Sequence, residues 1–259
     1  MNRLSALAII AQRDFLKFLR DKVRILATFI FPFLFIGVLG TSLQSNLSQE
    51  AGYNFLVFVF TGVVGQIHFQ SAAAGVISLI EDRKNDFSQE LFVTPISRYT
   101  IILGKIAGES MVALAQGLGV ILFALVMGVP IQFEKIIILA PVVAAISVFG
   151  GAFGILVMSN LSSERSANQI FPFVIFPQFF LAGVFSPIKN LPKALDIASK
   201  ITPMRYAVDL VRGVYYRGTP AYERVVLADP LVNIAVILLM FGSFLFIGTY
   251  LFVRNERNR

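Results

Sequence analysis

Few side chains in this sequence could do chemistry, and most of them interrupt long apolar stretches. The polar residues embedded in this way are Gln66, His68, Gln70, Lys105, Glu109, Gln116 and Gln178. Inside an apolar environment such groups bind a solute, carry a proton or hydrogen-bond a neighbouring helix. Lys105 and Glu109 are one helical turn apart, so they can form an ion pair. For His68, the single histidine, we favour helix packing or a cavity wall over a proton relay, because its stretch has no acidic partner.

Sequence motifs of enzyme active sites are absent. There is no GxxxxGK[ST] phosphate loop, and Gly104-Lys105 is followed by Ile106 within an apolar stretch. There is no HExxH zinc motif, Ser-centred nucleophile elbow or EF-hand loop either. The absence of cysteine excludes disulfides, thiolate metal sites and a cysteine nucleophile. We therefore expect no catalytic residue, no metal site and no cofactor in this chain.

The composition indicates an integral membrane protein. Of the 259 residues, 56% are hydrophobic and only 14% are charged, and the mean hydropathy is +0.77. Soluble domains are nearer to a quarter charged, and one soluble core could not bury this much apolar surface. The net charge of +7 then suggests cytoplasmic loops that face anionic lipid rather than a nucleic-acid partner.

Six apolar stretches are long enough to cross a bilayer, which takes about 20 residues. They are Ile25–Leu43, Tyr53–Ile80, Ile101–Val129, Ile136–Met158, Ile170–Phe185 and Leu231–Val253. The fifth is short and is interrupted by Pro172 and Pro177, which predicts a kink. GxxxG spacing, which permits close approach of helices, occurs at Gly104 and Gly108 and at Gly150 and Gly154. The sequence thus predicts an all-α integral membrane fold with six transmembrane helices in one domain.

The first 24 residues have the pattern of an amphipathic helix. One predicted face carries Leu4, Leu7, Ala11, Phe15 and Phe18. The opposite face carries Arg13, Lys17, Arg20 and Arg24. This pattern is typical of a helix that lies in the membrane interface. The alternative is an ordinary basic flank of the first span.

A polar segment separates the second and third spans. A helix is plausible from Glu81 to Val93, because the residue before Pro95 tends to leave the helical region. Apolar side chains among the charges, at Phe87, Leu91 and Phe92, would suit docking into a groove of another protein. A solvated connecting loop is the alternative, and the composition does not decide between the two.

The segment from Ser186 to Asp229 contains four prolines and two short helical patterns, neither long enough to span. These patterns predict short re-entrant or interfacial helices on the outer side of the membrane. Most Lys and Arg residues fall on the side of the amino terminus, apart from a basic group in this segment. With an even number of spans, this bias predicts that both termini are cytoplasmic.

Three blocks of the sequence resemble the ABC type-2 transporter permeases, especially their drug-exporter and daunorubicin-resistance-like branch. They are Glu81 with Glu90–Ser97 and Gly104-Lys105, then Phe180–Pro187 with Leu191-Pro192, and Thr202–Gly213. Family members commonly have asparagine where this chain has Thr202. The resemblance covers nearly the whole chain and implies a single ABC type-2 transmembrane domain over residues 1–259. Its implied parts are a connecting helix (1–24), spans one and two (25–80), a coupling segment (81–100), spans three to five (101–185), a re-entrant region (186–229) and span six (231–253).

The resemblance also implies roles for individual residues and for partner proteins. Residues implied in coupling to an ATPase are Glu81, Asp82, Arg83, Phe87, Glu90, Leu91, Phe92, Thr94 and Pro95. Those of the re-entrant motif are Pro203, Tyr206, Asp209 and Arg212. Such permeases pair as homodimers or close-paralogue heterodimers in the cell inner (plasma) membrane. They bind two ABC ATPase subunits, which hold the ATP and magnesium.

We therefore expect the membrane subunit of an exporter for an amphipathic drug, lipid or similar compound. Spans one, two and five would line its path. The candidate pathway residues are Gln66, His68, Gln70, Phe173, Phe176, Gln178, Phe179 and Phe180. The Phe side chains would form a hydrophobic gate, or alternatively a lipid-facing surface.

Three other functions stay open at this stage. A permease for a polysaccharide or glycolipid is compatible with the high Phe content, because aromatic rings also stack on sugars. An ion-coupled secondary transporter would need carboxylates inside the membrane, and only Glu109 qualifies. A membrane assembly protein that transports nothing would not need an ATPase partner.

Overall fold

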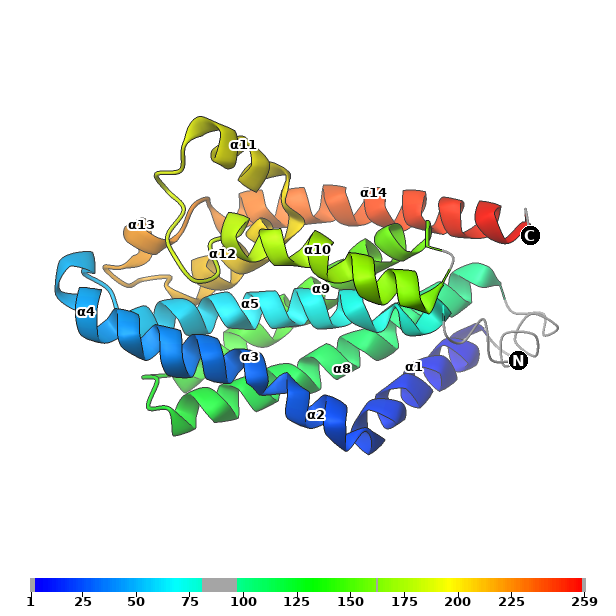
Figure 1. Ribbon diagram of the computed structural model, residues 1–259, viewed down its shortest axis with the longest axis horizontal. Helices are drawn as coiled ribbons and strands as arrows, with labels where there is room; N and C mark the ends of the chain where they lie inside the picture. Colours follow the sequence, from blue (N-terminus) through cyan, green and yellow to red (C-terminus); the bar gives the residue numbers. More distant parts are fainter. Residues whose placement is uncertain (1–2, 81–96, 162, 258–259) are drawn as a thin grey trace.

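The computed structural model describes residues 3–80, 97–161 and 163–257, and every regular element in these ranges is helical. The long helices run roughly along one axis and form an elongated bundle with both chain termini at the same end (Figure 1). The helices are α1 (Arg3–Arg20), α2 (Lys22–Thr28), α3 (Ile30–Pro32), η1 (Phe33–Gly40), α4 (Thr41–Ala51), α5 (Phe55–Gly75), α8 (Arg98–Val126), α9 (Phe133–Met158), α10 (Glu164–Leu181), α11 (Lys193–Ile201), α12 (Pro203–Tyr215), α13 (Tyr222–Val225) and α14 (Pro230–Arg257).

Five stretches in the described ranges are long and apolar enough to cross a membrane. They are Lys22–Asn46, Phe55–Ile80, Tyr99–Val126, Phe133–Met158 and Tyr222–Asn255. They coincide with five of the six predicted spans. The predicted fifth span, Ile170–Phe185, falls on α10, whose first two turns are polar and which is not among these five. The count of six spans therefore stays a prediction.

The first of these stretches is not a regular α-helix. After Pro32 the chain winds as a π-helix from Phe33 to Gly40 before α4 begins. Proline lacks the amide hydrogen that the preceding turn would use, and wider π turns are one way in which a helix absorbs such an interruption. Ile36, Gly37 and Gly40 of this stretch are buried, whereas Phe33 and Leu34 are exposed.

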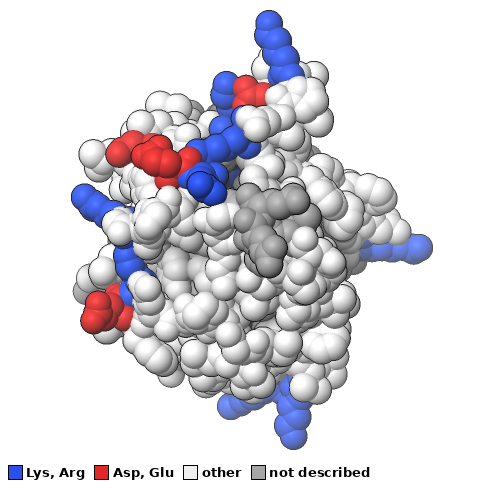
Figure 2. Space-filling model, turned by 90° about the vertical axis from the view of Figure 1, so that its left-hand side faces the viewer, with Lys and Arg blue, Asp and Glu red and all other residues white. Residues whose placement is uncertain are grey.

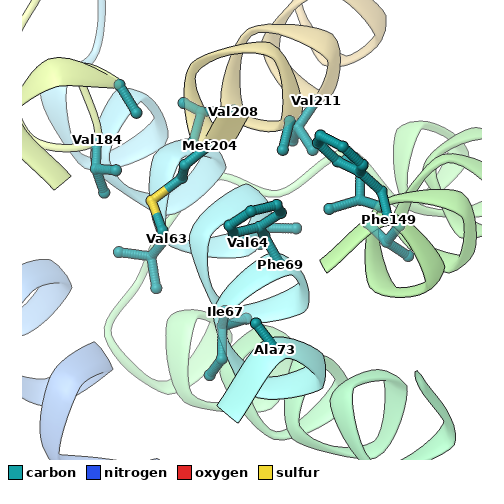
Figure 3. Close-up of a cluster of buried hydrophobic side chains, with 14 of the residues drawn as sticks. Val63, Val64, Ile67, Phe69, Ala73, Phe149, Val184, Met204, Val208 and Val211 are labelled. Atoms are coloured by element: carbon teal, nitrogen blue, oxygen red, sulfur yellow. The ribbon is translucent and has the colours of Figure 1, made fainter. Parts of the chain in front are cut away.

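Helix α5 lies at the centre of the bundle. It packs against α8, α9 and α12, and nearly all of its side chains are buried. Figure 3 shows side chains of α5 between Phe149 of α9 and the α12 residues Met204, Val208 and Val211. By contrast, α14 is largely exposed, as expected for a helix that faces lipid.

The GxxxG pairs predicted from the sequence lie at close helix contacts. A Cβ atom at Gly154 would stand 2.5 Å from the carbonyl oxygen of Ala73, and one at Gly150 would overlap the carbonyl oxygen of Phe69. On α8, a Cβ at Gly104 or Gly108 would stand 3.0 Å from α1. Glycine thus lets α9 approach α5, and α8 approach α1, backbone to backbone.

A helix occupies residues 3–20, but its buried face differs from the predicted one. Ala6, Ile10, Ala11 and Phe18 are buried against the bundle, whereas Leu4 is 72% exposed. The helix also stops at Arg20, because Asp21 caps a new helix through its side chain, so Arg24 belongs to α2. The apolar face packs on α8. Its placement at a membrane surface stays a prediction.

The end of the bundle away from the termini carries α4 and α13 (Figure 1). Seen from that end, basic side chains lie mainly at the edge of the molecule, acidic ones lie beside those at the left and the top, and most of the visible surface is uncharged (Figure 2). Short helices α11, α12 and α13 occupy the predicted re-entrant region, and their membrane depth stays a prediction. The predicted coupling segment covers residues 81–100, of which 81–96 lie outside the described residues.

The close contact between α5 and α9 gives a prediction about stability. The substitution Gly150→Val should destabilise the protein by about 1–3 kcal/mol, because the added atoms meet the backbone of Phe69 and cannot be accommodated by a rotamer change. Thermal unfolding in detergent micelles measures the effect. Gly242→Val on α14 is the matched control, since nothing lies within 4 Å of a Cβ there. Equal melting temperatures for the two variants would contradict the predicted contact.

A polar cavity beside a buried charge cluster

Among the described residues, five charged side chains meet where α1, α2 and α8 come together, and we call these five the charge cluster. Asp14 of α1 accepts from Arg13 at 3.0 Å and pairs with Lys105 of α8 at 2.9 Å. Glu109 lies 3.9 Å from Lys105 and 3.2 Å from the guanidinium of Arg24 on α2. The predicted pair of Lys105 with Glu109 is therefore confirmed, but Asp14 is the nearer partner of Lys105. Among the described residues, the cluster has three basic and two acidic groups.

The helices position this cluster through their buried faces. On α1, Ala6, Ile10, Asp14 and Phe18 recur every four residues, so Asp14 lies within the apolar face that contacts α8. On α5, a side chain at Gly75 would overlap the carboxylate of Glu109, so glycine leaves the space that this carboxylate occupies.

Burial makes these ion pairs obligatory. The side chains of Asp14, Lys105 and Glu109 are each only 2% exposed. A charge removed from water loses its hydration, and only a close opposite charge offsets that loss. The three buried side chains therefore depend on opposite charges nearby to offset their lost hydration.

A cavity of about 230 Å³ lies next to the charge cluster, between α2, α5 and α8. We call it the polar cavity. Its lining residues are Arg24, Ala27, Thr28, Phe31, Gln66, Ile67, Gln70, Ser71, Ala74 and Gln116. Arg24 belongs to both features, because its guanidinium bonds Glu109 while its side chain lines the cavity.

The polar lining is only partly hydrogen-bonded. The Gln116 amide donates to the Thr28 hydroxyl at 2.9 Å, and the Gln66 amide donates to Gln70. Two buried atoms of the lining have no hydrogen-bond partner among the described residues. They are the amide oxygen Oε1 of Gln66 and the hydroxyl oxygen of Ser71. Buried polar atoms are normally paired, so these two have capacity for water or a ligand.

His68 faces a different space from Gln66 and Gln70. It lines a separate cavity of about 250 Å³ between α5, α8 and α9, where its other neighbours are apolar. Its Nδ1 lies 2.7 Å from the carbonyl oxygen of Val64, which can only accept, so Nδ1 carries the proton in this contact. Among the described residues, no acidic side chain lines this cavity. This arrangement favours a packing or wall role for His68 over a proton relay.

The predicted pathway residues of α10 differ in how far they are exposed. Phe173, Phe176 and Phe180 are 82%, 56% and 56% exposed, whereas Phe179 is buried. The Phe179 ring packs 5.9 Å from that of Phe31, which joins α10 to the first span. Gln178 is also buried, and its amide oxygen accepts from the backbone of Met204 at the start of α12. Only three of the four Phe residues could therefore act as an exposed gate.

The predicted re-entrant motif forms a second polar site on α12. Pro203 is the first residue of α12. The Tyr206 hydroxyl donates to the carbonyl oxygen of Lys200 at 2.7 Å. Asp209 accepts from the backbone N–H groups of Leu227 and Ala228, at 2.7 and 2.9 Å. It also accepts from Asn233 of α14 at 2.8 Å. These bonds fix the chain that enters the last span.

Arg212 of the same motif is fully buried but remains in contact with polar and aromatic groups. Its guanidinium donates to the carbonyl oxygens of Val184 and Phe58 at 3.1 and 3.4 Å. It also lies 3.7 Å from the centre of the Phe58 ring, a cation–π contact. Burial lowers the pKa of Arg212 to about 10, so the group stays cationic at neutral pH. It joins α5, α12 and the turn after α10.

Several residues of these two sites were not predicted from the sequence. Asp14, Thr28 and Ser71 were not singled out, and Arg24 was placed on the wrong helix. A charged residue within an otherwise apolar helical face was the signal that could have revealed Asp14. Within residues 3–80, 97–161 and 163–257, no group of three or more His, Asp or Glu side chains could hold a metal ion.

The charge cluster gives a prediction about paired substitutions. Asp14→Ala should destabilise the protein by about 3–5 kcal/mol, because it removes the carboxylate that lies 2.9 Å from the buried Lys105 ammonium, whereas Glu109 is 3.9 Å away. Adding Lys105→Met should recover much of that loss, since the buried positive charge is then gone. Thermal unfolding of the single and double variants measures the coupling. Asp196→Ala removes partly exposed ion pairs with Lys200 and Arg205 and serves as the control, which should cost much less. A double variant no more stable than Asp14→Ala would contradict the pairing.

The capping role of Asp209 gives a graded prediction. Asp209→Ala leaves two backbone N–H groups and the Asn233 amide without their acceptor, which should cost about 1–3 kcal/mol or more. Asp209→Asn keeps one acceptor oxygen and should cost clearly less. The order of the melting temperatures is the measurement, and equal losses in the two variants would show that the charge, rather than the acceptor oxygens, matters.

Comparisons with known proteins agree with this architecture. The family model described as ABC-2 type transporter matches residues 5–216. The chain is 23% identical over 220 residues to the putative transport permease ycf38 of Cyanophora paradoxa, covering 82% of this chain and 74% of that protein. It is 22% identical over 191 residues to nodulation protein J of Rhizobium meliloti (strain 1021), covering 73% and 72%. It is 27% identical over 145 residues to the probable multidrug ABC transporter permease YbhR of Escherichia coli (strain K12), covering 54% and 38%. The chain therefore belongs to the ABC-2 type transporter family and is a membrane transport permease.

Proposed function

We propose that this permease is the membrane subunit of an ATP-driven exporter that moves an amphipathic compound out of the cytoplasm. The family match over residues 5–216 is the observation that carries the proposal. The sequence has no phosphate loop of its own, so the energy has to come from a separate ATPase subunit. The polar cavity among apolar helices supports transport of a molecule with one polar and one apolar part.

Two copies of the permease and two ATPase subunits would form the working complex. The exposed face of α10, with Phe173, Phe176 and Phe180, is an apolar surface suited to a second copy of the chain. The neighbouring residue Phe179 contacts Phe31, so a movement of α10 would also displace the first span. Closure of the ATPase dimer on ATP would move the segments at residues 81–96 and open a path between the two permeases.

The orientation in the membrane follows the same proposal. Both termini lie at one end of the bundle (Figure 1), as expected if the number of spans is even. That end would face the cytoplasm, where the ATPase subunits are. The short helices α11, α12 and α13 would then lie toward the outside.

A polysaccharide or glycolipid cargo is the second candidate within the same family. The similarity to nodulation protein J and to a probable multidrug permease does not select one cargo. An ion-coupled secondary transporter has less support. Glu109, the only carboxylate predicted inside a span, is held in ion pairs with Lys105 and Arg24 rather than left to bind a coupling ion.

Coupling to the ATPase can be tested at the predicted segment. Replacing Phe87 and Leu91 together with alanine should leave the permease inserted but weaken capture of its ATPase, because central apolar anchors typically contribute about 2 kcal/mol or more to an interface. It should also abolish substrate-stimulated ATP hydrolysis by the complex. Co-purification and hydrolysis assays of the co-expressed subunits measure both effects.

The matched control is Phe246→Ala, which removes an exposed ring from α14 and should affect neither assay. Wild-type ATPase capture and transport in the double variant, at normal expression, would show that the segment is only a connector. ATP hydrolysis by the permease purified alone, free of other subunits, would contradict the need for a partner.

A further inference from the structure

We propose that the polar cavity binds the anionic head group of an amphiphile, with the acidic group at Arg24 and a neighbouring hydroxyl or amide at Gln66. The proposal rests on the proposed function only in treating this amphiphile as cargo. Binding itself can be tested on the permease without its ATPase. A phosphoglycerol head group on a single alkyl chain has the required chemistry.

The charge of the cavity selects the sign of the ligand. Among the described residues, Arg24 is the only charged residue that lines the cavity, and its side chain is 35% exposed. The acidic members of the charge cluster lie behind Arg24 and are each paired with a cation. Arg24 would repel a cationic ligand, and no carboxylate among the described lining residues would offset that repulsion. An anion would form a charge-assisted hydrogen bond to the guanidinium.

The hydrogen-bonding groups of the cavity select the rest of the head group. Oε1 of Gln66 is buried, can only accept and has no partner among the described residues. Ser71, equally without a partner, can donate or accept. A ligand that satisfies both needs at least one hydroxyl or N–H group beside its acidic group. A bare fatty acid lacks that donor once it is ionised.

The size and the exits of the cavity place the tail outside. About 230 Å³ corresponds to roughly eight water molecules, which is room for a head group but not for a long chain as well. Phe31, 38% exposed, lies in the lining two turns beyond Arg24 and is followed by the exposed residues Phe33 and Leu34. An alkyl chain that leaves the cavity here would run along apolar surface into the membrane.

Occupancy of the cavity would reach the charge cluster through Arg24. The guanidinium is bonded to Glu109 at 3.2 Å, and Glu109 and Asp14 share Lys105. A bound anion competes with Glu109 for the same cation, which changes the attraction that holds α2 to α8. The ligand thus acts on the helices that meet α1 without touching α1.

The absence of tryptophan allows a direct binding test. Phe31→Trp places a single indole in the cavity wall, and all variants are made in this background. The protein in phosphatidylcholine nanodiscs is titrated with dodecyl lysophosphatidylglycerol, dodecylglycerol, dodecyltrimethylammonium and inorganic phosphate, and indole emission is recorded. We expect the anionic amphiphile to bind about tenfold or more tightly than dodecylglycerol, the gain typical of a charge-assisted contact. Dodecyltrimethylammonium and inorganic phosphate should bind much more weakly, the first because of its sign and the second because it lacks the tail.

Substitutions assign the binding to the named groups. Arg24→Gln should abolish the preference for the anionic amphiphile, and Arg24→Lys should retain most of it. Gln66→Leu should weaken binding several-fold without disturbing the charge cluster, so it remains informative if Arg24→Gln fails to fold. Gln169→Leu makes the same change on the exposed part of α10 and should have no effect. Equal affinity for the three amphiphiles, or full binding by Gln66→Leu and Arg24→Gln, would overturn the site.

The complex with its ATPase separates this inference from the export proposal. Stimulation of hydrolysis by the anionic amphiphile, lost in Gln66→Leu, supports both. Binding at the cavity without stimulation upholds the site and contradicts its use for cargo. Stimulation that is unchanged in Gln66→Leu leaves the export proposal standing and contradicts the site.

Discussion

The arrangement of the first half of the chain depends on keeping buried charges paired. Asp14, Lys105 and Glu109 are almost wholly removed from water, and each loses its hydration unless an opposite charge lies within bonding distance. Because these groups come from α1 and α8, and Arg24 comes from α2, the requirement fixes three helices relative to one another. The same requirement turns the Arg24 side chain toward Glu109 and places it in the wall of the polar cavity.

Close helix packing is the second constraint on how the helices are arranged. Glycines on α8 and α9 let α1 and α5 approach at backbone distance, and glycine at position 75 of α5 leaves room for Glu109. In a membrane there is little hydrophobic gain when apolar helices meet, so contact area and polar bonds decide which faces associate. Helix α5 combines the two: its glycines and apolar residues pack, while Gln66, Gln70 and Ser71 form one polar wall.

The sequence predicts those features that depend on neighbouring residues. Apolar length located five of the spans, GxxxG spacing located two close contacts, and the four-residue spacing of Lys105 and Glu109 predicted their pairing. The pairing of Lys105 with Asp14 joins residues 91 positions apart, as the difference of their numbers shows, and no local pattern specifies it. His68 lines a different cavity from Gln66 and Gln70 because residues four apart share a helix face, whereas a residue two positions on points to another side. The π-helical stretch after Pro32 was not predicted either, since hydropathy does not distinguish one helical winding from another.

Two arginines illustrate how burial separates a structural cation from one that can meet a ligand. Arg212 is fully enclosed, with carbonyl oxygens of Val184 and Phe58 and the face of the Phe58 ring around it, so a ligand has no route to its charge. Arg24 is held from one side by Glu109, and about a third of its side chain remains exposed toward a cavity with unsatisfied polar groups. A cation held on one side keeps enough hydration to be tolerated and enough free donors to exchange water for an anion. If the polar cavity takes cargo as we propose, Arg24 selects the chemistry of that cargo more directly than the aromatic residues of α10, whose exposed rings carry no charge.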